Sequence, residues 1–217
     1  MKQFLHNYRL EFLLIALLLL LFDKAFFTSD AIFTKYVWPF NMIILGVASF
    51  GIFKERNQSV KLLKNLLFVS SILIPIFFSL IIKNTIITQL SFIIYISYYF
   101  LIFIEVLRQI FQKTETNISV VFGSISGYLL LVVLAQFTYL LIEYNIPNSF
   151  SGIELGGIPK IYNQLSYFSM VTLSTVGFGD IAPLTDTARL STMFFTISGQ
   201  FYMVALVGII ISRFNNK

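Results

Sequence analysis

The sequence predicts an all-α membrane protein with six transmembrane helices and one short re-entrant helix before the last of them. Three observations lead to this fold class. Hydrophobic residues make up 57% of the 217 positions and charged residues only 12%, whereas soluble domains carry roughly 25% charged residues. The apolar residues gather in long runs, and the cations gather beside one set of their ends. So much apolar side chain cannot be buried in one small soluble core, which argues against a soluble enzyme, a disordered segment and a nucleic-acid-binding domain.

Each apolar run is long enough for a transmembrane helix, which needs roughly 20 residues. The first run follows a basic start, as in a signal peptide, but it ends in Asp23-Lys24 without a small-x-small cleavage site, so we expect a retained helix. Pro39 and Pro75 are tolerated in the second and third runs, because neighbouring groups in a membrane protein satisfy the freed carbonyls. The predicted spans are residues 10–27, 36–53, 62–82, 86–111, 118–144 and 187–214.

The Lys and Arg residues predict the orientation, because short cytoplasmic loops retain positive charge. One set of flanks holds ten of them: Lys2, Arg9, Lys54, Arg56, Lys61, Lys64, Arg108, Lys113, Arg213 and Lys217. The opposite set holds four: Lys35, Lys83, Lys160 and Arg189. We therefore expect a multi-pass protein of the plasma membrane with both termini in the cytoplasm. The net charge of +5 then needs no nucleic-acid partner.

Residues 145–174 interrupt the pattern of spans. The segment opens with glycines and prolines and continues as a short amphipathic stretch over residues 162–174. This stretch is too short to cross the bilayer and fits a re-entrant half-helix, which is tolerated at membrane depth only where protein or water surrounds it. Its carboxyl end carries a partial negative charge that favours a nearby cation.

The half-helix is followed by Thr175-Val176-Gly177-Phe178-Gly179-Asp180. The segment resembles the selectivity filter of potassium channels, usually Thr-Val-Gly-Tyr-Gly. In such a filter, stacked rings of backbone carbonyls and a threonine hydroxyl supply the cage of oxygens that a dehydrated potassium ion needs. Successive carbonyls can point the same way only if some residues adopt backbone angles that L-residues avoid. Gly177 and Gly179 can adopt these angles at little energetic cost. The side chains of Val176 and Phe178 are expected to point away from the pore and pack behind it.

The resemblance covers residues 118–214 and looks closest to bacterial six-helix subunits of the voltage-gated-like ion-channel superfamily. It implies a pore domain over residues 114–217, with outer helix 118–144, pore helix 162–174, filter 175–179 and inner helix 187–214. Residues 1–113 have the four-helix arrangement of a voltage-sensor-like domain. One chain supplies only one wall of the cage, so the resemblance also implies a homotetramer in membrane lipid. The transported ion is K+, bound by the backbone carbonyls of Thr175, Val176, Gly177 and Phe178 and by the Thr175 hydroxyl.

The residues expected to support this filter are Asp180, Tyr167, Phe168, Val171 and Ser174. Tyr167 and Phe168 stand where the family often has paired tryptophans. Val171 stands where some members place a glutamate that pairs with the filter aspartate, so Asp180 lacks that partner. Phe178 lacks the hydroxyl of the usual tyrosine. The sequence therefore predicts a weakly braced filter that loses conduction at low potassium.

Two glycines are expected to serve the gate. Gly199 lies twenty positions after Gly179, where family members have a glycine that lets the inner helix bend on opening. Close helix packing is the alternative role for this residue. Gly208 lies near the expected cytoplasmic constriction, and there bending and packing are equally favoured. Gly199, Gln200 and Tyr202 also resemble the Gly-Gln-x-Tyr stretch of bacterial channels.

The fourth predicted span carries too few charges for steep voltage sensing. Moving one charge through 100 mV is worth roughly 2.3 kcal/mol, so a steep response takes several charges per subunit. Residues 86–111 offer only Arg108, with Glu105 one turn earlier, and these two are expected to form an i,i+3 pair.

The function that the resemblance implies is passive, K+-selective conduction with weak or no intrinsic voltage sensing. Two alternatives remain: a weakly selective cation channel, and a non-conducting subunit that regulates other channel chains. No enzyme and no small-molecule substrate are expected, because the carboxylates are scattered and no nucleophile is paired with a base. The lack of cysteine and the Ile, Asn and Lys content favour a bacterial source.

Overall fold

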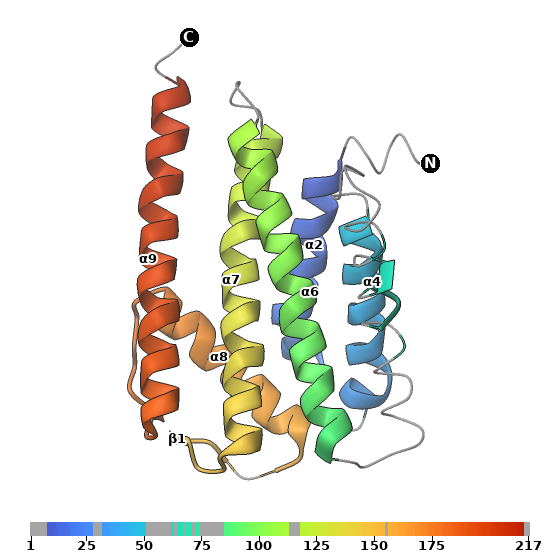
Figure 1. Ribbon diagram of the computed structural model, residues 1–217, viewed down its shortest axis with the longest axis vertical. Helices are drawn as coiled ribbons and strands as arrows, with labels where there is room; N and C mark the ends of the chain where they lie inside the picture. Colours follow the sequence, from blue (N-terminus) through green and yellow to red (C-terminus); the bar gives the residue numbers. More distant parts are fainter. Residues whose placement is uncertain are drawn as a thin grey trace.

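The computed structural model describes residues 8–27, 32–50, 85–112, 118–154 and 156–214, with a few positions between 62 and 73. The helices lie side by side along one axis, and α2 begins at the end of the molecule where α9 ends (Figure 1). The helices are α2 (Arg9–Phe22), α4 (Trp38–Phe50), α6 (Thr85–Gln112), α7 (Ile118–Asn145), α8 (Ile158–Leu173) and α9 (Asp186–Phe214). The short elements are η1 (Asp23–Phe26), η2 (Phe33–Val37), β1 (Phe150–Ser151) and β2 (Ala182–Pro183).

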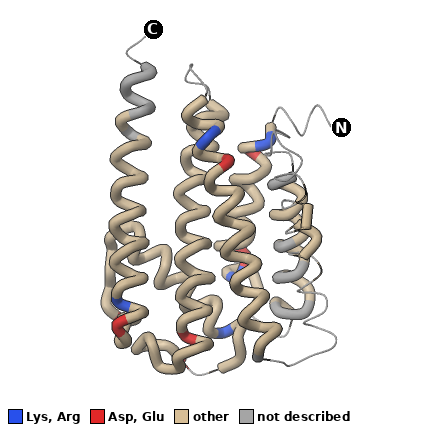
Figure 2. Tube along the Cα trace, in the orientation of Figure 1, with Lys and Arg blue, Asp and Glu red and all other residues tan. Residues whose placement is uncertain are grey.

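Two of these helices are long and apolar enough to cross a membrane by length and composition. They cover Ile86–Gln112 and Ile118–Asn145, with mean hydropathy 2.1 and 2.3. The charged residues of the described chain gather mostly toward the two ends of the helices (Figure 2). These findings agree with the predicted fourth and fifth spans.

The first two predicted spans differ in detail from the structure. The α-helical part of the first ends at Phe22 and continues as the 3-10 turn η1, where the buried Asp23 carboxylate accepts a hydrogen bond from Asn41 of α4. The second begins with the π-helical turn η2. Pro39 has no N–H for the carbonyl four residues earlier, which favours this wider turn. The third predicted span, 62–82, lies largely outside the described residues.

α7 forms the centre of the bundle and packs against α2, α6, α8 and α9. The Phe137 ring of α7 lies 5.2 Å from Tyr95 of α6 and 5.7 Å from Tyr162 of α8, measured between ring centroids. The Tyr139 ring contacts Phe168 of α8 at 5.4 Å and Phe195 of α9 at 5.8 Å. Aromatic contacts of this kind add to the apolar burial, so α7 holds α8 and α9 in fixed relative positions.

Candidate functional site

The half-helix predicted over residues 162–174 is α8, which begins earlier, at Ile158. Gly157 precedes its first turn with φ −68° and ψ 164°, and Pro159 lies within that turn, a common place for proline. α8 slants from the end of the molecule where α9 begins toward its middle (Figure 1). Its carboxyl end therefore points inward, as a re-entrant helix requires.

The backbone after α8 alternates between left-handed and ordinary conformations. φ is +63° at Thr175, +56° at Gly177 and +80° at Gly179, while Val176 and Phe178 between them keep negative φ. Glycine adopts positive φ without steric cost, but for Thr175 this conformation costs about 1–2 kcal/mol. Such strain persists where the surrounding structure enforces it, typically at functional sites.

Hydrogen bonds to the end of α8 hold the first part of this segment. The Val171 carbonyl accepts the N–H groups of Val176 at 3.0 Å and Gly177 at 3.3 Å, and the Thr172 carbonyl accepts the N–H of Thr175 at 3.0 Å. The Ser174 hydroxyl donates to the same Val171 carbonyl at 3.2 Å. The N–H and C=O of a trans peptide point in opposite directions. The carbonyls of Thr175 and Val176 therefore point away from α8.

One side of this segment is open within the single chain. A Cβ atom built on Gly177 or Gly179 would meet nothing within 4 Å. The side chains of Val176 and Phe178 are 54% and 70% exposed. Their expected packing behind the filter is therefore not provided by the described residues of the same chain.

Asp180 has a side-chain partner that the sequence did not predict. The Tyr167 hydroxyl donates a hydrogen bond to the Asp180 carboxylate, which raises the pKa of Tyr167. Val171 contributes through its backbone carbonyl, and Phe168 is buried against Tyr139 and Phe150. Asp180 thus lacks a glutamate partner but is braced by Tyr167.

The loop between α7 and α8 braces the outer end of this segment. The Glu143 carboxylate of α7 accepts the backbone N–H groups of Asn148 at 2.9 Å and Phe150 at 3.1 Å. Strand β1 then pairs antiparallel with β2, which follows the filter-like segment. The Ser149 carbonyl accepts the N–H of Leu184 at 2.7 Å. The Glu143 carboxylate thus holds this loop.

Gly152 makes the tightest contact between the loop and the filter-like segment. Its φ is +76°, and a Cβ atom there would lie 1.8 Å from the Asp180 carbonyl oxygen and 3.2 Å from the Ile181 Cα atom. Both neighbours are backbone atoms, which cannot rotate away as a side chain can. Only glycine fits this position, a requirement that becomes visible once the two segments are seen together.

α8 holds the other end of the loop. The Gln164 side chain accepts the N–H of Glu154 at 2.7 Å and donates to the Glu154 carbonyl at 3.2 Å. The Lys160 ammonium lies 2.7 Å from the Glu154 carboxylate and lowers the pKa of Glu154. Glu154 is therefore paired with Lys160 and bound to Gln164 through its backbone.

The two glycines expected at the gate lie in different surroundings. Gly199 is buried, and a Cβ atom there would lie 3.4 Å from the Leu173 side chain at the end of α8. A Cβ atom on Gly208 would meet nothing within 4 Å. α9 continues as one helix through both positions. Gly199 thus packs on α8, and its use as a hinge stays a prediction.

The expected pair on α6 is present. The Arg108 guanidinium lies 2.8 Å from the Glu105 carboxylate, and the Glu105 side chain is buried. The Gln109 side chain also donates to Glu105, at 3.4 Å. Arg108 therefore has a fixed partner on its own helix.

Comparison with known proteins places the similarity in this half of the chain. Residues 127–216 match a family model described as an ion channel. A 103-residue stretch is 34% identical to the voltage-gated potassium channel Kch of Escherichia coli (strain K12), covering 46% of this chain and 21% of that protein. A 103-residue stretch is 31% identical to two-pore potassium channel 4 of Arabidopsis thaliana, covering 46% of this chain and 35% of that protein.

A shorter stretch of 63 residues is 35% identical to the voltage-gated delayed rectifier potassium channel KCNH5 of Homo sapiens, covering 28% of this chain and 6% of that protein. No solved structure matches the chain. The chain thus spans only 6% to 35% of the length of these relatives. Residues 127–216 are thus similar to an ion-channel domain, and parts of the chain are similar to potassium channels.

Proposed function

We propose that this protein is a potassium-selective channel that conducts K+ passively across the plasma membrane. The observation that carries the proposal is the backbone of residues 175–179. Its alternating positive φ angles and the N–H groups tied to α8 leave carbonyl oxygens free on one side. Such oxygens replace the hydration shell of K+. K+ is the transported ion, and no catalytic residue takes part.

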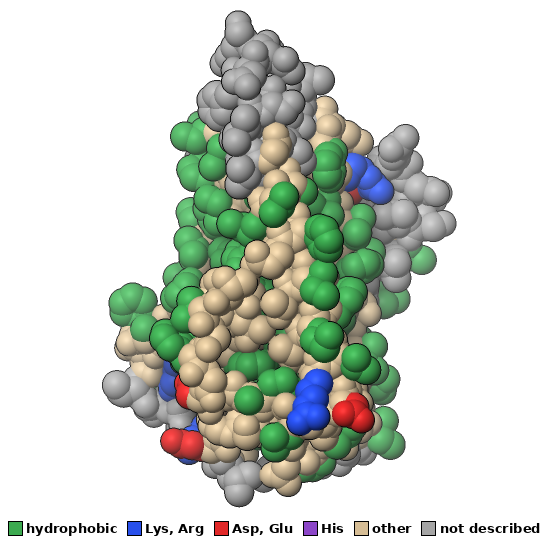
Figure 3. All heavy atoms as spheres, turned by 90° about the vertical axis from the view of Figure 1, so that its left-hand side faces the viewer, with side chains coloured by type: hydrophobic (Ala, Val, Ile, Leu, Met, Phe, Trp, Pro, Cys, Tyr) green, Lys and Arg blue, Asp and Glu red, His purple; other side chains and the backbone are tan. Residues whose placement is uncertain are grey.

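The open side of this segment supports a homotetramer, in which four such walls close the cage. Val176 and Phe178 are exposed in one chain, and a stripe of exposed apolar side chains follows α9 with helical spacing. The stripe contains Leu190, Met193, Phe194, Ile197, Phe201 and Val204. Apolar side chains extend along the height of the face that carries α9 (Figure 3). Neighbouring subunits would cover this face.

In this proposal residues 114–217 form the pore domain and residues 1–113 a voltage-sensor-like domain, with both termini in the cytoplasm. Gly199 is the hinge of α9, and Gly208 lies near the inner constriction. Voltage dependence is weak or absent, because Arg108 is the single cation of α6 among the described residues and is paired with Glu105. A steep conductance–voltage curve that Arg108→Gln abolishes would contradict this part.

The test is K+ uptake into liposomes that hold the purified protein, with Na+ as the competing ion and Ba2+ as the blocker. Uptake of K+, exclusion of Na+ and block by Ba2+ are expected. Gly177→Ala should abolish uptake, because alanine is strained at a φ of +56°. The control is Gly157→Ala, whose position has an ordinary φ of −68°.

Each other outcome identifies an alternative. Uptake of both ions would indicate a weakly selective cation channel. No uptake by a protein shown to be tetrameric, under conditions that open related pores, would favour a non-conducting subunit that regulates other channel chains.

A further inference from the structure

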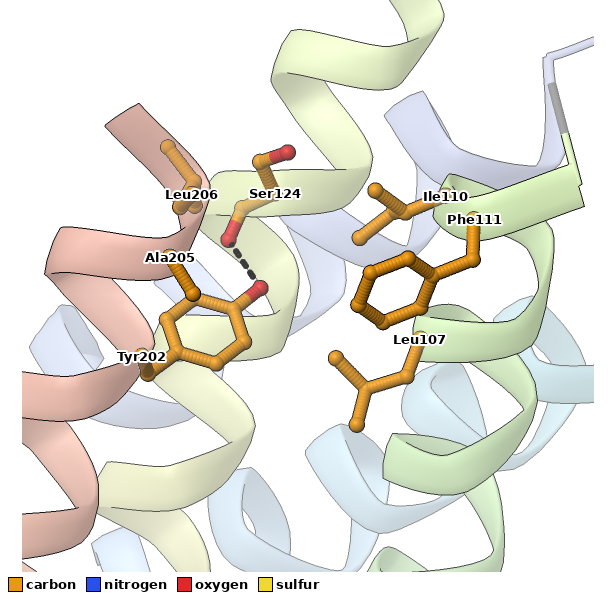
Figure 4. Close-up of a pocket in the computed structure, with 7 residues that line it drawn as sticks. All are labelled: Leu107, Ile110, Phe111, Ser124, Tyr202, Ala205 and Leu206. Atoms are coloured by element: carbon orange, nitrogen blue, oxygen red, sulfur yellow. Dashed lines mark hydrogen bonds between the residues drawn. The ribbon is translucent and has the colours of Figure 1, made fainter. Parts of the chain in front are cut away.

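Tyr202 attaches the inner half of α9 to α7. Its hydroxyl donates a 2.8 Å hydrogen bond to the backbone carbonyl of Ser124 (Figure 4). Tyr202 comes three residues after Gly199, so it lies on the cytoplasmic side of the proposed hinge. The bond therefore joins α7 to the part of α9 that bending at Gly199 would displace.

A glycine of α7 makes this contact possible. A Cβ atom on Gly127 would lie 2.1 Å from the Tyr202 hydroxyl oxygen and 2.9 Å from the ring carbon that carries it. The hydroxyl thus occupies space that any other residue at position 127 would fill. We call this space beside Gly127 the Gly127 notch. A hydroxyl confined there can donate its hydrogen bond from one position only, so a small displacement of the helix breaks the bond.

The space beside the Tyr202 ring is not fully packed. The ring contacts Phe103 of α6 at 6.0 Å and Tyr128 of α7 at 6.4 Å, measured between centroids. A cavity of about 40 Å³ adjoins it, lined by Leu107, Ile110, Phe111, Ser124, Tyr202, Ala205 and Leu206. Figure 4 shows residues of α6 facing those of α9 across this space. The inner half of α9 can therefore shift toward α6 by closing the cavity, whereas close-packed side chains would resist such a shift.

We propose that Tyr202, the Ser124 carbonyl and the Gly127 notch form a latch that holds α9 straight and is released when the pore opens. The latch rests on the proposed function, because it regulates the same pore. Bending at Gly199 moves Tyr202 relative to Ser124, and the adjacent cavity accommodates the shift. The latch thus favours the closed pore, and α6 borders the space into which α9 moves.

The first test is Tyr202→Phe, which removes the hydroxyl and keeps the ring contacts. Losing one hydrogen bond from the closed state should raise the open-to-closed ratio about two- to tenfold in single-channel recordings. Unitary conductance and K+ selectivity should stay the same, because the filter is untouched. The matched control is Tyr128→Phe, which removes a hydroxyl from a neighbouring ring that is not part of the latch.

The second test breaks the latch without changing Tyr202. In Gly127→Ala the new methyl group displaces the hydroxyl, so the open-to-closed ratio should rise as in Tyr202→Phe. The control is Gly123→Ala on the same helix, where the Cβ atom meets the end of the Leu10 side chain at 3.0 Å and that side chain can move. An open-to-closed ratio in Tyr202→Phe or Gly127→Ala that is equal to its control, or lower, would overturn the latch.

A third measurement does not depend on conduction. The chain contains no cysteine, and the Ser124 side chain is 1% exposed and lines the cavity. Ser124→Cys leaves the backbone carbonyl in place and adds a single thiol, whose rate of maleimide labelling should rise when Tyr202→Phe is added. If the parent protein conducts no K+ while labelling still responds, the proposed function fails, and what stands is the attachment of α9 to α7 by Tyr202 without its role in a pore. If it conducts K+ and neither readout responds, the latch alone fails.

Discussion

The outer end of the proposed pore domain is attached to its surroundings at many points, whereas the described residues in the inner half of α9 are attached at few. At the outer end, Glu143, Gln164 and the β1–β2 pair hold the loop and the filter-like segment by backbone hydrogen bonds. In the described part of the inner half, the Tyr202 hydroxyl donates a hydrogen bond to α7, beside a cavity. Ion coordination needs oxygens at fixed positions, while a gate needs an element with two arrangements.

α9 belongs to both regions. The Thr185 hydroxyl oxygen accepts the N–H of Ala188 at 3.3 Å, which caps the start of α9, and its own proton is donated to the Ser149 hydroxyl at 3.1 Å. Tyr202 lies more than four turns further along, and Gly199 lies between the two attachments. The same helix can therefore be fixed at the filter and displaced at the gate.

Among the contacts that hold the outer end, the largest effect should come from Gly152→Ala. The methyl group would collide with the Asp180 carbonyl at a positive φ, which costs at least about 2 kcal/mol and forces the backbone apart. We expect K+ uptake by liposomes to fall at least about tenfold, since oxygen positions at the filter would shift. Gly157→Ala, in the same loop at an ordinary φ, should keep most of the uptake. Normal uptake by Gly152→Ala would show that the outer end is less rigid than described.

Glu143→Gln should have the next largest effect. The amide oxygen accepts a hydrogen bond but the amide nitrogen does not, so one of the two loop N–H groups loses its acceptor at a cost of about 1–3 kcal/mol. We expect a lower thermal stability of the purified protein and a faster decline of current after potassium removal. The same substitution at Glu154 is the control, and equal effects at both sites would contradict the role of Glu143.

Tyr167→Phe tests the bond to Asp180 directly. Losing this exposed hydrogen bond should speed the loss of current in low potassium. The sequence predicts a weakly braced filter, so the parent protein itself should show such a loss. Tyr144→Phe, on α7 beside Phe92, serves as the control. If current in Tyr167→Phe survives potassium removal as well as in the parent, Asp180 does not depend on Tyr167.

Gly199→Ala examines the border between the two regions. The added methyl group would make ordinary contact with Leu173 at 3.4 Å, so the straight helix accepts it without a clash. Alanine favours helix over glycine by about 0.5–1 kcal/mol, and the open fraction should fall about two- to fivefold in single-channel recordings. Ser198→Ala is the neighbouring control. An unchanged open fraction would leave Gly199 a packing residue.

The smallest effect is expected at the exposed Lys160–Glu154 pair. The pKa of Glu154 is lowered by Lys160, so any stabilisation is present at neutral pH and is lost as the pH falls through that lowered value. Pairs this exposed contribute little. Glu154→Gln should therefore leave uptake unchanged at neutral pH, whereas Gln164→Ala, which removes two backbone contacts, should reduce it. A loss in Glu154→Gln equal to that in Gln164→Ala would reverse this order.

Much of the structure from α6 to α9 follows from local sequence. The apolar runs predict α6 and α7 to within a residue or two at each end, and the glycines at 177 and 179 predict the positive φ angles found there. The predicted start of the half-helix, residue 162, lies four residues after the observed start of α8 at Ile158. Gly157 and Pro159 are typical of loops, although proline also suits a first helical turn. Thr175 at positive φ was not predicted, since no local preference favours it.

The sequence by itself determined α6 and α7 and the positive φ angles at Gly177 and Gly179. Both depend on neighbours in the chain: on apolar length in the helices, and on the alternating glycines in residues 175–179. The tertiary structure alone decided the partner of Asp180, the two bonds of Glu143 and the need for glycine at 152. It also decided the hydrogen bond of Tyr202, whose acceptor lies 78 residues earlier in the sequence. These contacts join segments distant in sequence, and their geometry exists only after α7, α8 and α9 have packed together.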